Sequence, residues 1–264
     1  MRGIWNFVAS AVAGVAIVGA SPVFAQQDNL LQKIKDKGTL RVCTAGYSPW
    51  TIKNPVTNVW EGIVPEIVKE VGENLKVKVE WVDVTWATII PSLQSDKCDL
   101  AATALWTAPQ RAEVISFTRP IGSDGMSIFV PASSNARSLA DLDQKGKIIT
   151  VAAGSGDERT AKSLFKNAEV KSVVADRANS AVMEVAAGRA DGASAAFSGT
   201  AQLIKVNPNL KVKPIEGLIY NETPFAFGTP PREYFFRDYM NVIIGNMETA
   251  GKLQEIKDKW TKLR

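Results

Sequence analysis

The sequence predicts an α/β protein of two similar lobes, each a mainly parallel sheet flanked by helices, joined by two hinge crossovers. Three observations support this prediction. Strand and helix patterns alternate as β-α-β-α-β within about 80 residues from residue 39 onward, an order typical of a parallel sheet. The alternation starts again near residue 147, and an amphipathic tail at residues 232–263 then provides apolar residues that can cover a sheet.

The first half begins with a short helix at residues 30–37, which Gly38 closes. In the helix after the first strand, Pro65 stands in the first turn, where a proline is tolerated. The expected elements are, in order, strand 39–44, a polar hairpin tip at 54–60, helix 62–75, strand 76–84, helix 86–95 and a buried strand at 99–105. Right-handed crossovers between three strands in this order give a parallel sheet.

A further strand at residues 125–130 ends at Pro131, where small polar residues mark a boundary. The second half is expected to contain, in order, strand 147–152, helix 158–165, strand 170–174, helix 178–187 and buried strand 191–197. Segments 92–100 (SLQSDKCDL) and 184–192 (EVAAGRADG) are loosely alike, since each joins a helix end to a strand through a basic residue and an aspartate. This similarity favours two lobes of one design.

The chain is expected to return to the first lobe near its end. Residues 226–228 cross back, two prolines follow, and Gly251 breaks the helical tail. Because the first lobe otherwise has fewer helices, we expect the tail to pack there. Lobe 1 then comprises residues 26–130 and 227–264, and lobe 2 comprises residues 131–226, with a ligand cleft between them.

The first 25 residues have the three parts of a secretory signal peptide: Arg2, an apolar stretch at residues 7–20, and small residues that end at Ala25. We expect cleavage after Ala25 and export to the periplasm. A permanent membrane anchor needs a longer apolar span, and no cysteine stands near the cleavage site to carry a lipid. No later segment is apolar enough to cross a bilayer.

The composition excludes several function classes. The net charge of +4 comes from 31 basic and 27 acidic residues without a basic run, so nucleic acid is not an expected partner. Histidine is absent, which removes the commonest general base and metal ligand, and we expect no metal or cofactor. An oxidising compartment permits a disulfide between Cys43 and Cys98, whereas unpaired cysteines in these buried strands would pack as small apolar residues.

Two features indicate a ligand site. Arg111 follows the end of the buried strand, where open α/β sheets bind ligands, and its guanidinium matches a carboxylate. The alternative is an ordinary surface arginine. Residues 153–157 (AGSGD) lie between a strand and a helix, which leaves backbone N–H groups available to an anion at the helix start. As a phosphate loop this motif is incomplete, because it lacks the lysine followed by serine or threonine.

The chain resembles the periplasmic solute-binding proteins of ABC importers, specifically the polar amino acid-binding group (bacterial extracellular solute-binding protein family 3). The matching stretches, which cover nearly the whole chain after the signal peptide, are GTLRVCTAGYSPW (38–50), EGIVPEIVKEVGENLKVKVEWV (61–82), WATIIPSLQSDKCDLAAT (86–103), TAPQRAEVISFTRP (107–120), SLADLDQKGKIITVAAGSG (138–156), GRADGA (188–193) and GKLQEIKDKW (251–260). The ordered set carries the resemblance, which implies the two-lobed periplasmic binding protein fold.

The resemblance also implies roles for individual residues. Tyr47 and Trp86 match aromatic residues that sandwich the ligand side chain, and Arg111 matches the arginine that clamps the ligand carboxylate. The other matching positions are Thr103 and Ala104 at the end of the third strand, and Ser155 and Gly156 in the second-lobe loop, all of which meet the same carboxylate. On the residues alone, Tyr47 and Trp86 could instead be core aromatics, and Ser155 only a helix cap.

Three positions depart from the family's pattern. Ala196 stands where an aspartate usually holds the ligand α-amine, and Trp106 stands where a small hydroxyl residue is common. Ala45 and Gly46 occupy the turn in which relatives that bind cationic side chains place an acid. A buried ammonium without a carboxylate partner is unfavourable by several kcal/mol, as an order of magnitude. An ordinary α-amino acid is therefore not the expected ligand.

These departures predict a pocket with one carboxylate anchor and apolar, indole-rich walls. The walls are expected from Trp86 and Trp106, with Trp50 or Trp60 as further candidates. Such a pocket suits an oxo acid, an aromatic acid or a neutral amino acid better than lysine or arginine.

The function implied is that of an exported receptor without enzyme activity. It would capture a small carboxylate between closing lobes and deliver it, as a monomer, to the permease subunits of an ABC importer in the inner membrane. The alternative is a cyclohexadienyl dehydratase-like enzyme on the same fold, which needs a general acid; Asp157 and Glu158 qualify, although both can be first-turn acids favoured by the helix dipole. A third class, the ligand-sensing domain of a membrane receptor, normally requires a transmembrane segment. No such segment is expected here, so this class is not favoured.

Overall fold

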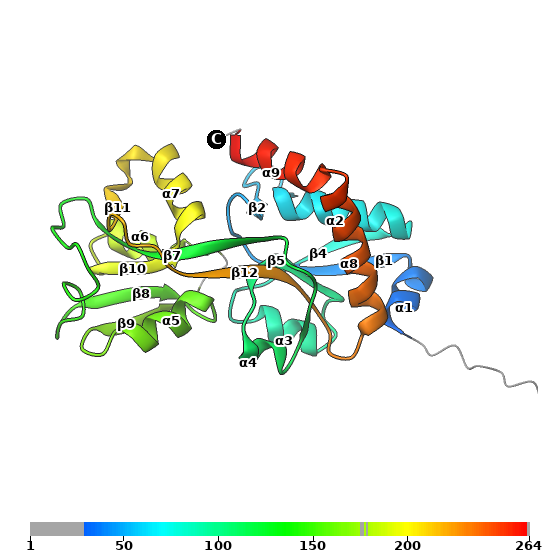
Figure 1. Ribbon diagram of the computed structural model, residues 1–264, viewed down its shortest axis with the longest axis horizontal. Coiled ribbons are helices and arrows are strands. Elements are labelled where there is room, and N and C mark those ends of the chain that lie inside the picture. Colours follow the sequence, from blue (N-terminus) through cyan, green and yellow to red (C-terminus); the bar gives the residue numbers. More distant parts are fainter. Residues whose placement is uncertain (1–28, 175–176, 178, 263–264) are drawn as a thin grey trace, which may run out of the picture.

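The computed structural model describes residues 29–174, 177 and 179–262, so the predicted signal peptide lies outside the described residues. Two groups of helices and strands lie side by side along the long axis, and one sheet runs through both (Figure 1). Its main path has the strand order β4-β1-β5-β12-β7-β10-β8-β9. At one end β4 (Lys78–Asp83), β1 (Thr39–Thr44) and β5 (Leu100–Trp106) pair in parallel. The predicted α/β class is confirmed.

The opposite end of the sheet repeats this design. There β10 (Gly192–Ala196), β8 (Ile148–Ala152) and β9 (Glu169–Val173) pair in parallel. Two long strands at the middle of the sheet, β7 (Gly122–Pro131) and β12 (Tyr220–Thr229), pair antiparallel with each other and join the two ends. The strand predicted at 125–130 and the crossing predicted at 226–228 are therefore parts of longer strands, which begin three and six residues earlier, respectively.

Helices cover both faces of each parallel group (Figure 1). In the first half, α1 (Leu30–Lys37) ends at Gly38 as predicted, while α2 (Ile63–Leu75) and α3 (Ile89–Gln94) lie on opposite faces of β1 and β5. Helix α3 starts three residues later than predicted. The Thr88 hydroxyl accepts a hydrogen bond from the Thr85 backbone N–H at 3.0 Å, and this local turn replaces the first turn of the helix.

In the second half, α5 (Gly156–Leu164) and α6 (Ser180–Ala186) flank β8 and β10 from opposite faces. Helix α7 (Phe197–Val206) follows β10 directly and was not predicted. The shorter elements are the hairpin strands β2 (Ile52–Lys53) and β3 (Trp60–Glu61), as predicted, and the unpredicted α4 (Pro109–Ala112), β6 (Ser116–Phe117), β11 (Val212–Pro214) and 3-10 helix Pro208–Leu210.

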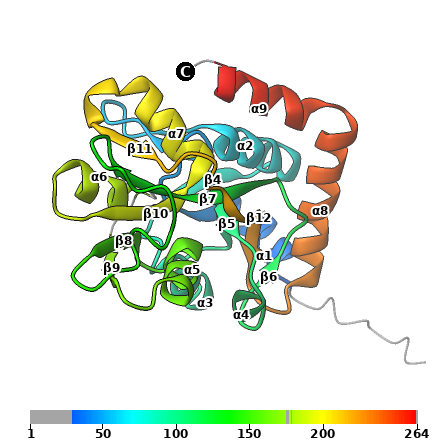
Figure 2. The same cartoon turned by 60° about the vertical axis from the view of Figure 1, so that its left-hand side comes forward.

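The C-terminal tail forms α8 (Tyr234–Thr249) and α9 (Lys252–Lys262), separated at Gly251, whose φ is +74°. Both helices pack on the first half, α8 against α1 and α9 against α2, as Figures 1 and 2 show. Glu66 of α2 accepts hydrogen bonds from Lys259 Nζ at 2.7 Å and from Trp260 Nε1 at 2.6 Å. The tail thus returns to the first half, as expected. None of the described helices is long and apolar enough to span a membrane.

The similarity between segments 92–100 and 184–192 has a structural counterpart. The Asp99 carboxylate accepts a hydrogen bond from the backbone N–H of Arg41, and the Asp99 N–H donates to the Arg41 carbonyl. Asp191 makes the same pair of bonds with Ile148. Asp99 therefore fixes β1 to β5, and Asp191 fixes β8 to β10, so the two halves share one local design.

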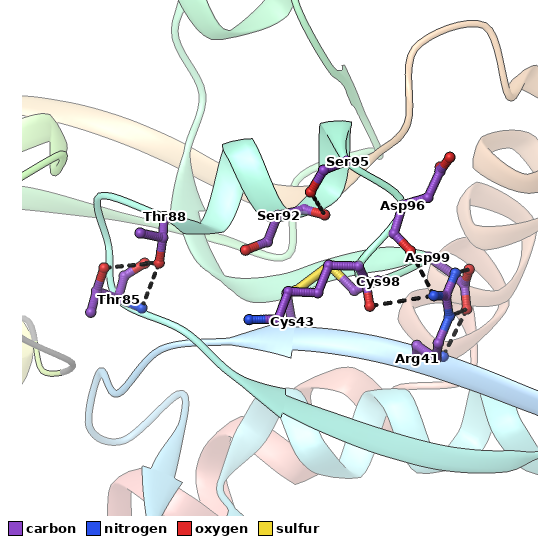
Figure 3. Close-up of a disulfide and its surroundings, with 10 residues drawn as sticks. Arg41, Cys43, Thr85, Thr88, Ser92, Ser95, Asp96, Cys98 and Asp99 are labelled. Carbon is purple, nitrogen blue, oxygen red and sulfur yellow. Dashed lines mark hydrogen bonds and ion pairs between the residues drawn. A yellow bond between two sulfur atoms is a disulfide. The ribbon is translucent and has the colours of Figure 1, made fainter.

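Cys43 of β1 and Cys98, just before β5, form a disulfide, so the structure settles the alternative that the sequence left open (Figure 3). Both residues are buried. Arg41 lies beside the disulfide and forms an ion pair with Asp99 at 2.6 Å. The disulfide and the ion pair together tie β1 to β5, and β5 leads to the candidate site.

Candidate ligand-binding cleft

A small cavity of about 20 Å³ lies between the two halves of the protein. Both halves contribute to its walls, which are formed by Tyr47, Trp86, Trp106 and Arg111 from the first half and Ser155, Gly156, Asp157 and Ala196 from the second. A wider cavity of about 140 Å³ shares Tyr47 and Ala196 with it. Seven of the nine predicted site residues are thus brought together around one small space.

Arg111 lies on α4, the short turn that follows β5, and its side chain crosses the cleft. It is 6% exposed. Its Nη1 donates to the Trp106 carbonyl at 2.7 Å and its Nη2 donates to the Gly154 carbonyl of the other half at 2.8 Å. Burial, together with the nearby charge of Arg159, lowers the pKa of Arg111 to about 10, so the group stays protonated at neutral pH.

Within the described part of the chain, Arg111 forms no ion pair. A buried charge that has only neutral hydrogen-bond partners is unfavourable, and an anion in the cavity would compensate it. A carboxylate matches the fork of the guanidinium group. This arrangement suits the predicted carboxylate clamp.

The aromatic pair does not have the expected geometry. The ring centroids of Tyr47 and Trp86 are 6.3 Å apart with planes at 73°, so the rings meet edge to face. A sandwich needs two facing rings with a slot between them, and this conformation has no such slot. The Tyr47 hydroxyl instead donates to Oδ2 of Asp124 at 2.5 Å.

Asp124, on the crossing strand β7, is a functional candidate that the sequence reasoning missed. Its carboxylate accepts hydrogen bonds from the Tyr47 hydroxyl, from the Ser198 hydroxyl at 2.8 Å, and from the Gly125 backbone N–H at 2.9 Å. Burial raises the pKa of Tyr47 well above its ordinary value, and the charge of Asp124 adds to this rise. Asp124 thereby connects the first half, the crossing strand and the start of α7.

The loop before α5 closes against the first half at Gly154, whose φ is +76°. A Cβ atom at this position would lie 2.5 Å from Cα of Ala87, so the close approach requires glycine. The Ser155 hydroxyl accepts a hydrogen bond from the Glu158 N–H at 3.2 Å, which makes it the N-cap of α5. Ser155 is therefore a helix cap and also a residue that lines the cavity.

The structure corrects the expectation of wholly apolar cavity walls. Asp157 lines the cavity beside Gly156, although Ala196 indeed contributes no carboxylate. Asp157 is 7% exposed, and its Oδ1 has no hydrogen-bond partner among the described residues. Burial raises the pKa of Asp157 to about 7, and the charge of Asp124 also raises it, while Arg111 acts in the opposite direction. The cavity therefore holds a cationic and an acidic group.

Glu158, the other carboxylate considered from the sequence, is engaged elsewhere. It accepts hydrogen bonds from the Gly154 N–H at 2.6 Å, from Lys162 Nζ at 2.7 Å and from the Ser172 hydroxyl at 2.6 Å. It is not among the residues that line the cavity.

Thr103 and Ala104 do not line the cavity. The Thr103 hydroxyl donates to the Ala45 carbonyl at 3.1 Å inside the first half, and Ala104 is fully buried. The reason is that β5 continues to Trp106, so the residue at the cleft end of the strand is this tryptophan. The family match placed the end of the strand about three residues too early.

The two further tryptophan candidates are also absent from the walls around Arg111. Trp50 meets Phe225 edge to face, with ring centroids 4.5 Å apart. Trp60 lines the wider cavity and donates from Nε1 to Asp83 at 2.8 Å. Among the described residues, no group of three or more Cys, Asp or Glu side chains is arranged to hold a metal ion.

Comparison with known proteins places this cleft in context. A family model described as "Bacterial extracellular solute-binding proteins, family 3" matches residues 40–263. A probable amino-acid ABC transporter periplasmic-binding protein of Sinorhizobium fredii is 29% identical over 187 residues, which cover 69% of this chain and 61% of that protein's own length. The cyclohexadienyl dehydratase of Pseudomonas aeruginosa is 23% identical over 98% of this chain and 96% of the enzyme.

Solved structures of amino acid-binding proteins have a similar fold. A mutant of the arginine-binding protein ArgBP from T. maritima has a TM-score of 0.80 at 22% identity, over 88% of this chain and 99% of that chain. An ancestral amino acid-binding protein, described as a precursor of cyclohexadienyl dehydratase, has a TM-score of 0.79 at 26% identity with the same coverage of both chains.

Proposed function

Because this chain belongs to family 3 of the bacterial extracellular solute-binding proteins, we propose that it is the periplasmic receptor of an ABC importer and captures a small carboxylate between its lobes. The ligand is an amino acid or an amino acid-like organic acid. Relatives named as amino-acid ABC transporter binding proteins in Sinorhizobium fredii and Haemophilus influenzae support this assignment. The chain is a binding protein rather than an enzyme.

The observation that carries the proposal is the state of Arg111. Its guanidinium is buried, remains charged at neutral pH, and has only backbone carbonyls as hydrogen-bond partners in the described chain. One of these carbonyls belongs to Gly154, on the opposite side of the cleft. A ligand carboxylate supplies the missing negative charge and favours the closed arrangement, because the anion can be held from both sides at once.

The lobes of the proposed receptor are residues 26–130 with 227–264, and residues 131–226. The strands β7 and β12 carry the chain from one half to the other, which supports their assignment as the hinge segments. The packing of α8 and α9 on α1 and α2 supports the inclusion of the C-terminal tail in the first lobe.

Export and delivery complete the proposed function. The signal peptide is cleaved after Ala25, and the mature protein acts as a monomer in the periplasm. The permease subunits of the importer recognise the closed form and accept the ligand from it.

Isothermal titration calorimetry with a panel of amino, oxo and hydroxy acids tests the proposal. At least one carboxylate should bind the wild type, and Arg111→Ala should weaken it by about 2–5 kcal/mol, or roughly 30- to 5,000-fold in Kd. Arg119→Ala is the matched control, since Arg119 is half-exposed and pairs with Glu248 away from the cavity. An unchanged affinity in Arg111→Ala would falsify the assignment of the anchor.

A dehydratase is the second candidate because Asp157, a buried carboxyl with a pKa of about 7, has a property required of a general acid. Under the receptor assignment, incubation of the protein with prephenate or arogenate gives no aromatic product. Turnover that Asp157→Asn abolishes would support the enzyme instead.

A further inference from the structure

The cavity contains an acidic group that the proposed carboxylate anchor does not use. Asp157 lies at the start of α5, where the Ser155 cap and the following turn carry it into the second-half wall of the cavity. Its side chain is buried, and its Oδ1 accepts no hydrogen bond from the described residues. A buried polar atom left without a partner is costly, so it indicates a group that binds there.

The charged and titratable groups around Asp157 do not satisfy it. Arg111 donates to two carbonyls, and Arg159 donates to the Ser155 carbonyl at 3.5 Å; neither forms an ion pair with Asp157 in the described structure. Asp124 is a second acid and is itself held by Tyr47, Ser198 and Gly125, as described above. Tyr220 makes its hydrogen bond with the Ser194 hydroxyl at 3.0 Å. Hydrogen bonds from its own backbone N–H and from the Ser155 hydroxyl stabilise part of the Asp157 carboxylate, but Oδ1 has no partner and no cation pairs with it in the described structure. An ammonium group on the ligand can supply both.

The cavity walls place this acid in the same small space as the buried arginine. Arg111 and Asp157 come from opposite halves and line the same small cavity. Ala196, also in the wall, has only a methyl group and offers no competing charge. A compact zwitterion complements this pair of charges.

We propose that Asp157 is the counter-ion of an ammonium group on the ligand, so that the ligand is a zwitterion with its carboxylate at Arg111 and its ammonium at Asp157. This proposal rests on the proposed function, and it departs from the expectation that an ordinary α-amino acid is not the ligand. The protein carboxylate that binds the ammonium group is then at the start of α5. The family resemblance placed the amine-binding position at the end of β10, at Ala196. Asp157 is thereby a specificity-determining residue of the cleft.

A proton linkage follows from the burial of Asp157. An ammonium partner favours the ionised carboxylate, whereas the carboxyl of the closed, ligand-free protein is about half protonated near pH 7. Binding below this pH therefore releases a proton, and the affinity rises with pH until Asp157 is ionised in both states. The Arg111 and Tyr220 pKa values of about 10 and about 12 keep these neighbours in one protonation state across this range.

The test is calorimetry with matched sets of compounds that share one carbon skeleton. Each set contains an L-amino acid, its 2-hydroxy acid and its 2-oxo acid, with the skeletons of alanine, leucine, glutamate and phenylalanine. In the set that binds best, wild type should prefer the amino acid at least tenfold. Asp157→Asn, which keeps the shape of the side chain, should lower the affinity for the amino acid at least tenfold and remove the preference.

Glu184→Gln is the control, because Glu184 lies in the same half but pairs with Arg189 and does not line the cavity. It should keep the wild-type preference. Titrations near pH 6 in two buffers of different ionisation enthalpy should show proton release in wild type and none in Asp157→Asn.

The outcomes separate the two proposals. If the hydroxy or oxo acid binds as tightly as the amino acid, or if Asp157→Asn keeps the preference, the assignment of Asp157 is wrong while the carboxylate receptor stands. If no member of any set binds the wild type, the receptor function and the assignment of Asp157 both fail.

Discussion

Substitution of Gly199 by alanine separates closure of the cleft from folding. Gly199 is the third residue of α7, and a Cβ atom there would lie 2.4 Å from the Ser48 carbonyl oxygen and 2.7 Å from the Tyr47 ring. Both neighbours belong to the other half. A backbone oxygen cannot rotate aside, so the halves must remain slightly apart in the variant.

The substitution is expected to weaken ligand binding without lowering the stability of the ligand-free protein. Forcing an extra methyl group into a packed contact costs about 1–3 kcal/mol, which corresponds to a loss of affinity of roughly 5- to 150-fold. Within the helix itself, alanine is preferred over glycine by about 1 kcal/mol. Gly199→Ala should therefore bind the carboxylate ligand more weakly, while its ligand-free free energy of unfolding is unchanged or slightly higher.

Calorimetry measures the affinity, urea denaturation measures the stability, and small-angle X-ray scattering measures closure with saturating ligand. Gly245→Ala in α8 is the control, because its added methyl group meets only the movable end of the Arg119 side chain. If Gly199→Ala binds and closes like the wild type, the contact between α7 and residues 47–48 is not part of the ligand-bound state, and the reasoning fails.

Two further predictions concern stability. Replacement of both Cys43 and Cys98 by serine opens a loop with a sequence separation of 55 and should lower the free energy of unfolding by about 4 kcal/mol in urea denaturation; a loss well below 1 kcal/mol would contradict the loop-closure argument. The pKa of Asp157 rises from 3.8 to about 7 on folding, so the folded state binds its proton more tightly. The stability of ligand-free wild type should therefore fall by at most about 4 kcal/mol as the pH rises from 4 to 7, relative to Asp157→Asn. Parallel stability curves for the two proteins would show that the carboxyl is not buried in solution.

Where a local signal is strong, the sequence predicted the elements closely. The helix Leu30–Lys37 and the strand Thr39–Thr44 have the predicted bounds, because an apolar pattern and a glycine cap define them without help from distant residues. The tail also divides at Gly251 as expected.

The middle of the sheet was harder to predict for a physical reason. Strand β12 contains Pro224 and Asn221, which signal a turn, yet register shifts between Tyr220 and Thr223 and between Ala226 and Gly228 accommodate the irregular residues. Helix α7 begins directly at the end of β10 and contains Gly199, so neither a cap nor a strong helix former marks its start.

In the candidate site, too, residues marked by a local sequence pattern were predicted, whereas residues whose role depends on tertiary contacts were missed. The position of Arg111 after a buried strand was sufficient to nominate it, and the structure brings it into the cavity. The burial of Asp157 depends on the other half closing over α5, which no local pattern records, and an aspartate in a first helical turn is common for dipole reasons alone. Asp124 lies on a strand that joins the halves, so its partnership with Tyr47 also depends on the tertiary arrangement.

Native mass spectrometry of the mature protein, purified from the periplasm without added ligand, tests the central claim most directly. The account predicts a one-to-one complex with a small molecule, which fragments as a carboxylic acid with an amino group and is lost in Arg111→Ala. Retention of the same molecule by Arg111→Ala, or a bound molecule without a carboxyl group, would contradict the account.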